Sequence, residues 1–341
     1  MISIYPSLVA RVRATTARAA PFVLLLGAGC DAGTVGKDDA PAPVGTDDTD
    51  PVADTDTDTD TDTDTDTDTD TDTVPGAVTR FVALGDAGEG NDAQYAVADA
   101  IKAVCDRDGC DFALYLGDNF YDSGVSDTED SQWDEKFELP YAELDFPFYP
   151  VLGNHDYGGN GGAFEVDRAN TQVEYSSYSD KWVMPATFYS HVQGDATFIA
   201  LDTTALDWGR GEEQQAWLPG VIAAADTQWK IAYGHHPYIS NGDHGDANDN
   251  FGPFFEDNLC GQVDVYLCGH DHHLEWLEPT CGTEFIISGA GAKLRGVGGA
   301  NPDFYAAAQL GFMWVEIDGD TFTGVFYDEN GDELFRRSFQ K

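Results

Sequence analysis

The stretch FALYLGDNFY, residues 112–121, is an apolar run that ends in glycine and is followed by polar residues. A short apolar run bounded by a turn predicts a buried strand, and glycine lets the backbone turn sharply at its end. Asp118 is therefore expected at the carboxyl end of a strand. Tyr121 has two interpretations, because it either packs over the turn or directs its phenol at whatever Asp118 binds.

Four other apolar runs end in glycine and polar residues, and they read LGDAG (84–88), LGNHD (152–156), YGHHP (233–237) and CGHDHH (268–273). Sites in α/β sheets form at the carboxyl ends of strands, because loops converge there. The five ends carry carboxylate, amide and imidazole groups of the kind that bind metals, from Asp86, Asp118, Asn154, His155, His235, His236, His270, His272 and His273. One such end alone is usually a turn, but five in one chain predict a metal site.

The order of the elements predicts an α/β (α+β) fold. Strands and helices alternate early in the chain, with helices expected at about 92–105 and 133–139. Strands predominate later, and residues 158–180, which are rich in Gly, Asn, Ser and Tyr, are expected to form a long surface loop. The pattern is typical of a mixed sheet or two packed sheets with helices outside. No boundary interrupts residues 77–341, which are predicted to be one domain.

The net charge of −45 is unusually negative. Residues 1–73 hold 16 Asp, no Glu and four basic residues, so 46 acidic and 13 basic residues leave a charge of −33 on residues 74–341. Such a surface repels nucleic acid and anionic membranes, and neither is an expected partner. An anion-binding site would need its own positive charge, which bound metal ions would supply.

Residues 1–30 are predicted to be an export signal. Three arginines precede the apolar run PFVLLLGAG, which is too short to span a bilayer and ends at Cys30. The end of this run resembles the lipobox of bacterial lipoproteins, although Gly27 stands where leucine is usual. The resemblance implies a cell-envelope lipoprotein with lipid on Cys30. Secretion or a periplasmic location without lipid, and a buried N-terminal helix, are the alternatives.

Residues 31–76 are expected to be a disordered acidic tether. From residue 54 to residue 73 aspartate alternates with threonine. The aspartates repel one another and the segment has no apolar face to bury, so it is expected to stay extended. A calcium-binding role is the alternative to a solvated spacer.

Six cysteines fit an oxidising compartment. Cys105 and Cys110 lie close together around a turn, and Cys260 and Cys281 flank one strand-loop unit, so these two disulfides are expected. Cys268 lies within an apolar strand and is expected to be a buried free thiol. Other pairings stay open on the sequence alone.

In order along the chain, GDAG, GDNFY, GNHDY, GHHP and GHDHH resemble the five motifs of the calcineurin-like metallophosphoesterases. The resemblance runs from about Arg80 to the C-terminus and includes SGAG at 288–291. It implies a four-layer α/β/β/α sandwich, in which helices flank two mixed sheets packed face to face. It also implies a dinuclear metal site at the carboxyl ends of the strands and the cleavage of phosphate esters.

One departure narrows the resemblance. Most of the superfamily begins with Asp-X-His, but Gly88 stands here in place of the histidine. Purple acid phosphatases make this replacement and supply a tyrosine three residues after the bridging aspartate, as Tyr121 follows Asp118. The segment GHHPYISNGDHG, residues 234–245, also resembles the small, mammalian tartrate-resistant branch of that group.

The resemblance implies a role for each matched residue. Fe(III) would be bound by Asp86, Asp118, Tyr121 and His272, and a divalent Fe, Zn or Mn ion by Asp118, Asn154, His235 and His270. Substrate or leaving group would be contacted by His155 and His244, whereas no ligand role falls on His236 and His273. The implied reaction is that of an acid phosphatase, in which a metal-bound hydroxide attacks a small phosphate monoester.

Two other functions stay open. One is a metallophosphoesterase that uses two divalent metals on diesters or nucleotides, which Tyr121 and Gly88 oppose. The other is a non-catalytic anchored surface protein that binds a ligand or calcium, which the complete ligand set opposes. The protein is expected to be a monomer that meets a membrane only through the lipid on Cys30.

Overall fold

A computed structural model describes residues 78–249 and 251–341. The predicted export signal 1–30, with Cys30, and the predicted tether 31–76 lie outside the described residues. Within the described ranges, no helix combines the length and the apolar character needed to cross a lipid bilayer.

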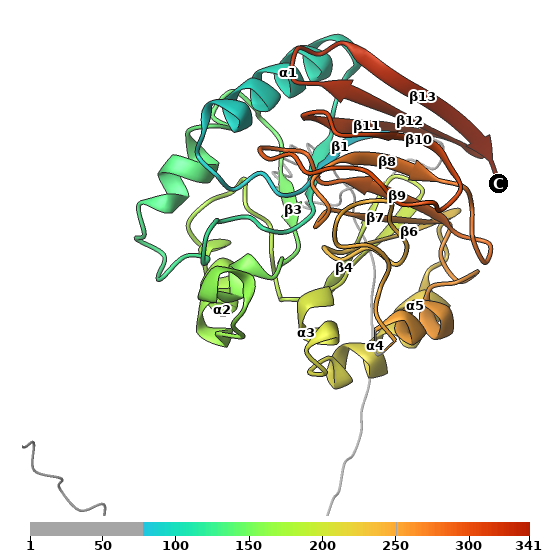
Figure 1. Cartoon of the computed structure of the whole chain (residues 1–341), viewed down its shortest axis with the longest axis horizontal. Helices are drawn as coiled ribbons and strands as arrows, with labels where there is room; N and C mark the ends of the chain where they lie inside the picture. Colours follow the sequence, from blue (N-terminus) through green and yellow to red (C-terminus); the bar gives the residue numbers. More distant parts are fainter. Residues whose placement is uncertain (1–77, 250) are drawn as a thin grey trace, which may run out of the picture. The chain divides into compact units, whose positions relative to one another are not determined.

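The first of two mixed sheets has the strand order β13-β12-β11-β1-β2-β3 (Figure 1). Its strands are β1 (Thr79–Leu84), β2 (Phe112–Tyr115), β3 (Phe148–Pro150), β11 (Gly311–Asp318), β12 (Thr321–Asp328) and β13 (Glu333–Gln340). The neighbours β1, β2 and β3 are parallel, and the C-terminal strands add to β1 as an antiparallel meander. Three of the five predicted motifs, LGDAG, LGDNFY and LGNHD, lie at the ends of the parallel strands β1, β2 and β3.

The second sheet has the order β10-β8-β9-β7-β6-β5-β4. Its strands are β4 (Tyr189–Gln193), β5 (Ala196–Ala200), β6 (Trp229–Tyr233), β7 (Val265–Cys268), β8 (Leu274–Leu277), β9 (Glu284–Ser288) and β10 (Asp303–Ala307). The central neighbours β5, β6, β7 and β9 are parallel. Strands β4, β8 and β10 run antiparallel at the sides. Because the central strands are covered on both faces, they are continuous apolar runs in the sequence.

The core lies between the two sheets. Phe81 and Phe112 of the first sheet stack at 5.1 Å, and both meet the ring of Phe198 from the second sheet edge-on, at 5.3 and 5.2 Å. All three side chains are fully buried. This contact joins the sheets face to face, which confirms the predicted architecture.

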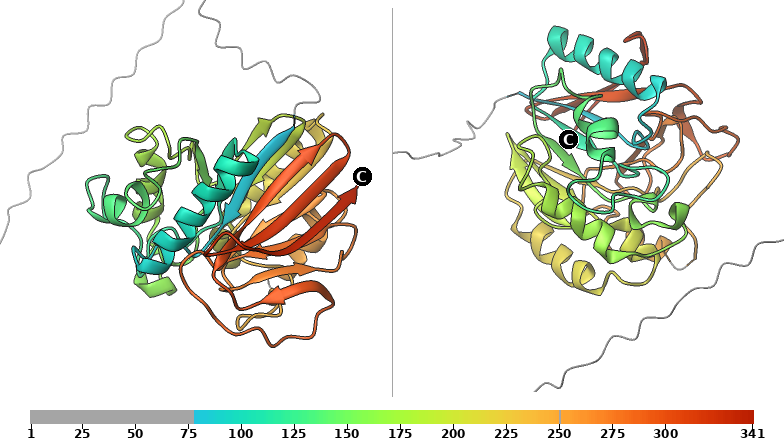
Figure 2. Two further views of the ribbon diagram at one scale, coloured as in Figure 1. Left: turned by 90° about the horizontal axis from the view of Figure 1, so that it is seen from above. Right: turned by 90° about the vertical axis from the view of Figure 1, so that its left-hand side faces the viewer.

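Helices cover the outer sides of the sheets. They are α1 (Asp92–Asp108), α2 (Val166–Tyr175), α3 (Thr203–Asp207), α4 (Glu212–Ala224) and α5 (Gly252–Asn258), with short helical turns at Asp134–Glu138, His155–Tyr157 and Gly159–Gly161. Helix α1 runs along the first sheet (Figure 2). Helices α4 and α5 lie on the far side of the second sheet in Figure 1, where a second apolar cluster joins them to β5, β6 and β7.

The prediction of a long loop over residues 158–180 was wrong, because α2 lies there. Its buried face includes Ala169, Gln172 and Tyr175, which are spaced three residues apart as a helix face requires. Tyr175 stacks on Trp133 at 3.5 Å. The helix was missed because Gln172, a polar residue, occupies a core position and conceals the apolar periodicity.

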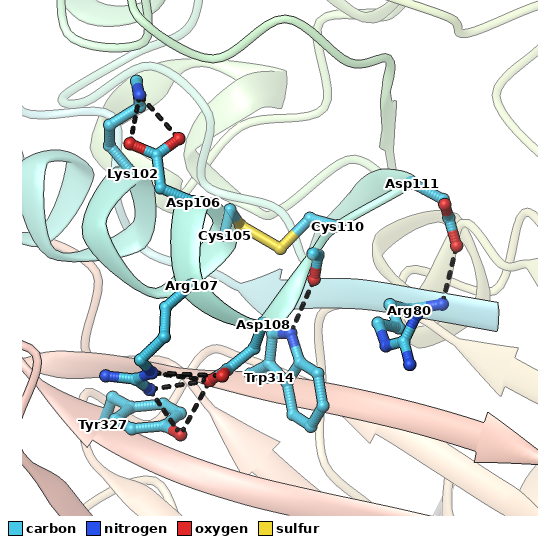
Figure 3. The surroundings of a disulfide bond; sticks show 11 residues. Arg80, Lys102, Cys105, Asp106, Arg107, Asp108, Cys110, Asp111, Trp314 and Tyr327 are labelled. Atoms are coloured by element: carbon cyan, nitrogen blue, oxygen red, sulfur yellow. Dashed lines mark hydrogen bonds and ion pairs between the residues drawn. A yellow bond between two sulfur atoms is a disulfide. The ribbon is translucent and has the colours of Figure 1, made fainter. Parts of the chain in front are cut away.

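Both predicted disulfides are present, and Cys268 is a buried free thiol. Cys105–Cys110 ties the end of α1 to the start of β2, where Trp314 Nε1 also donates to the carbonyl of Gly109 at 2.9 Å (Figure 3). Two disulfides in one chain indicate an oxidising compartment and so an exported protein.

Candidate metal centre

The five predicted strand ends meet at one edge, with β1, β2 and β3 from the first sheet and β6 and β7 from the second. Backbone bonds connect these loops. Gly85 N, after β1, donates to Ser288 O of β9 in the second sheet at 2.7 Å, and Gly269 N donates to His235 O at 3.0 Å within the second sheet. Residues far apart in sequence therefore converge, as predicted.

Three of the predicted ligands have left-handed backbone conformations. The φ angles are 57° at Asp86, 53° at Asp118 and 69° at His270. Positive φ is uncommon for residues other than glycine and costs free energy, so it persists only where the surroundings impose it. Its recurrence at three strand ends supports a functional role for these turns.

One cluster forms around Asp86. The Tyr121 hydroxyl donates to Asp86 Oδ1 at 2.9 Å and lies 3.2 Å from His272 Nε2. His272 Nε2 lies 3.3 Å from the same carboxylate oxygen. Ligand atoms of Asp86, Asp118 and His272 all lie within 4.8 Å of one another, and these residues and Tyr121 are buried.

A second cluster forms on the other side of Asp118. His235 Nε2 lies 3.1 Å from Asn154 Oδ1, 3.1 Å from His270 Nδ1 and 3.5 Å from Asp118 Oδ1. Asp118 is thus common to both clusters, as a bridging ligand must be. The structure brings together all seven residues predicted to bind metal.

Backbone contacts orient the ligands. His235 Nδ1 lies 2.9 Å from Leu116 O, and because a carbonyl only accepts, Nδ1 donates to it and Nε2 is the nitrogen directed at the cluster. The backbone N–H of His270 donates to Asp86 Oδ2 at 2.8 Å, and that of His155 donates to Asp118 Oδ1 at 2.9 Å. These bonds hold the donor atoms in place.

The electrostatics of the clusters fit metal ions. Burial raises the pKa of the Tyr121 phenol well above its ordinary value, and the charges of Asp118 and Asp86 raise it further. A phenolate at this position therefore requires a strong local positive charge, which a trivalent ion supplies. Burial and the neighbouring His236 and His235 lower the pKa of His270 well below its ordinary value, which keeps the imidazole neutral, as ligation requires.

Gly88 explains the missing histidine. A Cβ at Gly88 would lie 2.0 Å from the carbonyl oxygen of Asn119, so no side chain fits there. The close approach is fixed by two backbone bonds, from Gly88 N to Asp118 O at 3.2 Å and from Tyr121 N to Gly88 O at 2.9 Å. The same contact that excludes a histidine therefore positions Tyr121, which resolves its two interpretations in favour of a phenol directed at the centre.

The two histidines predicted to contact substrate flank the clusters. The ring of His155 lies 4.5 Å from that of Tyr121, and its Nε2 lies 4.0 Å from Asp118 Oδ2. The ring of His244 stacks on His270 at 4.1 Å, and its Nε2 accepts a bond from Arg295 at 2.8 Å. Sequence reasoning did not identify Arg295.

His236 and His273 contact other protein groups. His236 Nδ1 lies 3.0 Å from Thr203 Oγ1, with its ring 4.4 Å from that of His270. His273 Nε2 lies 2.8 Å from Glu275 Oε2, and both side chains are fully buried. His236 and His273 therefore lie next to the site, each with a ring nitrogen bonded to another protein group.

Two buried carboxylates support the centre and were missed from the sequence. Asp156 accepts the backbone N–H groups of Asn119, Phe120 and Gly153, and burial together with the charge of Asp118 raises its pKa to about 7. Asp271 accepts from Ser240 Oγ at 2.5 Å and from the backbone of His244 at 2.9 Å. Asp156 lies inside the motif GNHDY and Asp271 inside GHDHH, so their positions in these motifs could have indicated a role at the site.

A lysine also lies against the predicted tyrosine ligand. Lys293 Nζ is 3.5 Å from the ring centroid of Tyr121 and pairs with Glu89. A cation over an aromatic face is an attractive contact, and it packs the phenol in place. Lys293 lies two residues after the SGAG segment, and the sequence of that segment did not indicate a cation there.

Residues 79–274 match the family model described as calcineurin-like phosphoesterase. The chain belongs to this family. Among its relatives, tartrate-resistant acid phosphatase type 5 of Sus scrofa is 31% identical over 77% of this chain and 87% of that protein. Purple acid phosphatase 3 of Arabidopsis thaliana is 30% identical over 74% of this chain and 75% of that protein. The predicted resemblance to small purple acid phosphatases is therefore confirmed.

Two solved structures have a similar fold. The purple acid phosphatase PPD1 from Lupinus luteus seeds aligns with a TM-score of 0.64 and 18% identity, over 78% of this chain and 55% of that chain. GAP50, described as the anchor in the inner membrane complex of Plasmodium, aligns with a TM-score of 0.66 and 23% identity, over 77% of this chain and 89% of that chain. At these identities the likeness concerns the fold alone.

Proposed function

We propose that the chain hydrolyses phosphate monoesters as a purple acid phosphatase, with Fe(III) and a divalent ion in its centre. The observation that supports this most is the position of the Tyr121 hydroxyl, within hydrogen-bond distance of Asp86 and His272. A phenolate is a hard anionic donor suited to a trivalent ion. Membership of this phosphatase group and the buried cluster both favour a dinuclear site.

The residues divide into two ligand sets that share Asp118. Fe(III) would be held by Asp86, Asp118, Tyr121 and His272, and the divalent Fe, Zn or Mn ion by Asp118, Asn154, His235 and His270. When bound, a pair of such ions lowers the pKa of bound water and offsets negative charge on phosphoryl oxygens. That positive charge also allows an acidic protein to bind an anion.

The flanking residues His155 and His244 would act in proton transfer and in orienting the substrate. His155 Nδ1 donates to Asp122 O at 2.8 Å, so Nε2 is the atom that exchanges a proton at the centre. The guanidinium of Arg295 only donates, so His244 Nε2 accepts and Nδ1–H remains as a donor to a substrate oxygen. Protonation of the leaving alkoxide is the step assigned to one of these two rings.

The visible absorption spectrum of purified protein tests the proposal. A tyrosinate–Fe(III) charge-transfer band is expected, together with hydrolysis of p-nitrophenyl phosphate from acid to neutral pH. Tyr121→Phe removes the phenol oxygen and keeps the ring, so the band is expected to vanish while the fold is retained. A band that persists in Tyr121→Phe, or protein without iron, would overturn the assignment.

We also propose that the protein is exported as a bacterial lipoprotein, with lipid on Cys30 and residues 31–76 as a tether to the domain at 77–341. A lipobox-like sequence and a spacer without an apolar face support this. The protein is expected to be a monomer without nucleic-acid partners. Mass spectrometry of the mature N-terminus tests the predicted lipid anchor. An unmodified Cys30, or cleavage at another residue, would contradict it.

A further inference from the structure

Two cavities lie next to each other beside the second cluster, and Trp208 lines both. The smaller, of about 280 Å³, is bounded on one side by Asn154, His244 and His270 and on the other by Trp208 and Phe251. The larger, of about 560 Å³, extends from Trp208 past Tyr157, Phe164 and Glu212. The two cavities share Trp208 as a lining residue and are here together called the Trp208 groove.

Trp208 is held rigidly by its own turn. It follows α3 directly, and its backbone N–H donates to Thr204 O at 3.0 Å. The next residue, Gly209, has a φ of 65°, and its N–H donates to Leu206 O at 2.9 Å. The indole is therefore presented by a fixed backbone.

The indole extends a stack of aromatic rings and still leaves much of its surface exposed. Trp208 packs against Phe164 at 5.7 Å, and Phe164 stacks on Tyr157 at 4.2 Å. Even so, 43% of Trp208 is exposed, although the indole is a large apolar side chain that lines both cavities. An exposed, rigid aromatic surface of this kind is suited to packing against a planar ligand.

The groove is also acidic. Asp207 and Asp246 line the smaller cavity, and Glu212 and Glu213 line the larger. Among the residues that line the two cavities, Arg210 is the one cation, and it lies over the Phe164 ring at 5.5 Å. A second phosphate or a carboxylate would be repelled there, whereas a positive charge would be attracted.

We infer that the Trp208 groove binds the leaving group of the substrate and selects phosphate monoesters with an aromatic, neutral or positively charged leaving group. The inference rests on the proposed function. It implies that a phosphotyrosine flanked by lysines is a good substrate and that a nucleoside triphosphate is a poor one. Trp208 is the specificity-determining residue in this view, and the acidic lining supplies the charge preference.

The test compares substrates with the same chemical leaving group. Two short phosphotyrosine peptides are hydrolysed by the metal-loaded full chain, one with lysine and one with glutamate on both sides of the phosphotyrosine. At low ionic strength we expect kcat/KM for the lysine peptide to be at least about 10-fold higher than for the glutamate peptide, because its KM is lower. Added salt should reduce this difference. Asp207→Asn should reduce this preference.

Substitution of Trp208 isolates the aromatic contribution. Trp208→Ala is expected to raise KM for the lysine peptide about 3- to 10-fold and to leave a lysine-flanked phosphoserine peptide nearly unaffected. Trp208→Phe, which keeps an aromatic ring, should have a KM close to that of the wild type. This variant also shows whether the fold tolerates a substitution at position 208. Tyr178→Ala is the matched control, because Tyr178 is also an exposed aromatic residue (64%) but lines neither cavity.

The outcomes separate the two levels of the proposal. Hydrolysis with equal kcat/KM for both phosphotyrosine peptides, or an unchanged KM in Trp208→Ala, would overturn the groove assignment and leave the phosphatase intact. Absence of hydrolysis of the peptides and of p-nitrophenyl phosphate by metal-loaded protein would overturn the phosphatase, and the groove assignment with it.

Discussion

At the scale of single residues, the centre depends on one close approach between two turns. Gly88 leaves no room for a side chain, and its backbone bonds place the turn that carries Tyr121. One packing contact thus accounts both for the absence of a side chain at Gly88 and for the position of Tyr121.

Gly88→Ala is therefore expected to damage both stability and the metal centre. Its Cβ would lie 2.0 Å from Asn119 O, so the turns must separate. We expect the free energy of unfolding to fall by about 1–3 kcal/mol, measured by urea denaturation, with reduced iron content. Gly220→Ala is the control, because Gly220 lies in α4 with open space around its added methyl group. Equal stability of the two variants would contradict the packing argument.

His191 provides a pH-dependent contribution to stability. It stacks between Tyr149 and Phe198, at 3.9 and 5.1 Å, and burial lowers its pKa to about 3. The unfolded chain, with an ordinary histidine pKa of about 6.5, takes up a proton that the folded chain does not accept until about pH 3. Its stabilising contribution is therefore complete above about pH 6.5 and is lost as the pH falls.

We expect this one proton to lower the free energy of unfolding by about 1.4 kcal/mol per pH unit between about pH 6 and 4. His191→Phe keeps the ring stack and removes the proton, so its acid sensitivity should be smaller by that slope. Urea denaturation at a series of pH values measures it. A variant with the same pH slope as the wild type would show that His191 titrates normally in the folded state.

At the scale of elements, the loop between β6 and α5 is fixed to the β7–β8 turn by Asp271. Besides binding Ser240 and the His244 backbone, Asp271 packs against Gly242, where a Cβ would lie 2.3 Å from the Asp271 Cγ. The residue between two predicted ligands thus determines where His244 lies. Asp271 therefore links the turn that carries the predicted ligands His270 and His272 to the loop that carries His244.

Asp271→Ala is expected to lower kcat/KM about 10- to 100-fold, the usual scale for supporting residues around a metal site. The physical reason is the release of His244 from the centre, so metal content should be retained. Asp271→Asn, which keeps an acceptor, should recover part of the activity. Asp243→Ala on the same loop is the control, because Asp243 is exposed. Loss of metal together with activity would show that Asp271 acts on the ligands instead.

At the scale of the whole molecule, the excess of acidic residues opposes folding and substrate binding alike. Residues 74–341 carry a net charge of −33. Ion pairs such as Arg80–Glu316 and Arg337–Glu284 offset a minority of the acids. The remainder repel one another, and they repel an approaching anion until it reaches the metal centre.

Added salt is therefore expected to stabilise the protein. Raising NaCl from 10 to 300 mM shortens the Debye length from about 30 Å to less than 8 Å. Relief of about 1 kcal/mol of repulsion corresponds to a rise in Tm of about 2–4 °C for a domain of this size. Thermal unfolding followed by circular dichroism measures this rise in Tm, and KCl at the same concentrations is the control, because it screens charge equally and should give the same rise. A Tm that falls with salt would mean that ion pairs dominate.

Much of the fold and most of the centre were accessible from local sequence patterns. Strands buried on both faces are apolar runs, and glycine followed by polar residues marks their carboxyl ends. The resemblance to purple acid phosphatases, with Gly88 in place of histidine and tyrosine three residues after Asp118, predicted Tyr121 as a ligand from short sequence motifs. The disulfides were predicted from local patterns as well, since Cys105 and Cys110 lie around one turn and Cys260 and Cys281 flank one strand-loop unit.

Contacts between distant segments were decided by the tertiary structure alone. Helix α2 was missed because its core residue Gln172 bonds to Asn119 and Asp156, partners that its own sequence cannot reveal. Arg295 and Lys293 became part of the centre through the packing of their loop. The acidic groove around Trp208 likewise combines residues from separate loops. A strand end carries its ligands in its own sequence, whereas the surroundings of the ligands exist only once the two sheets have packed.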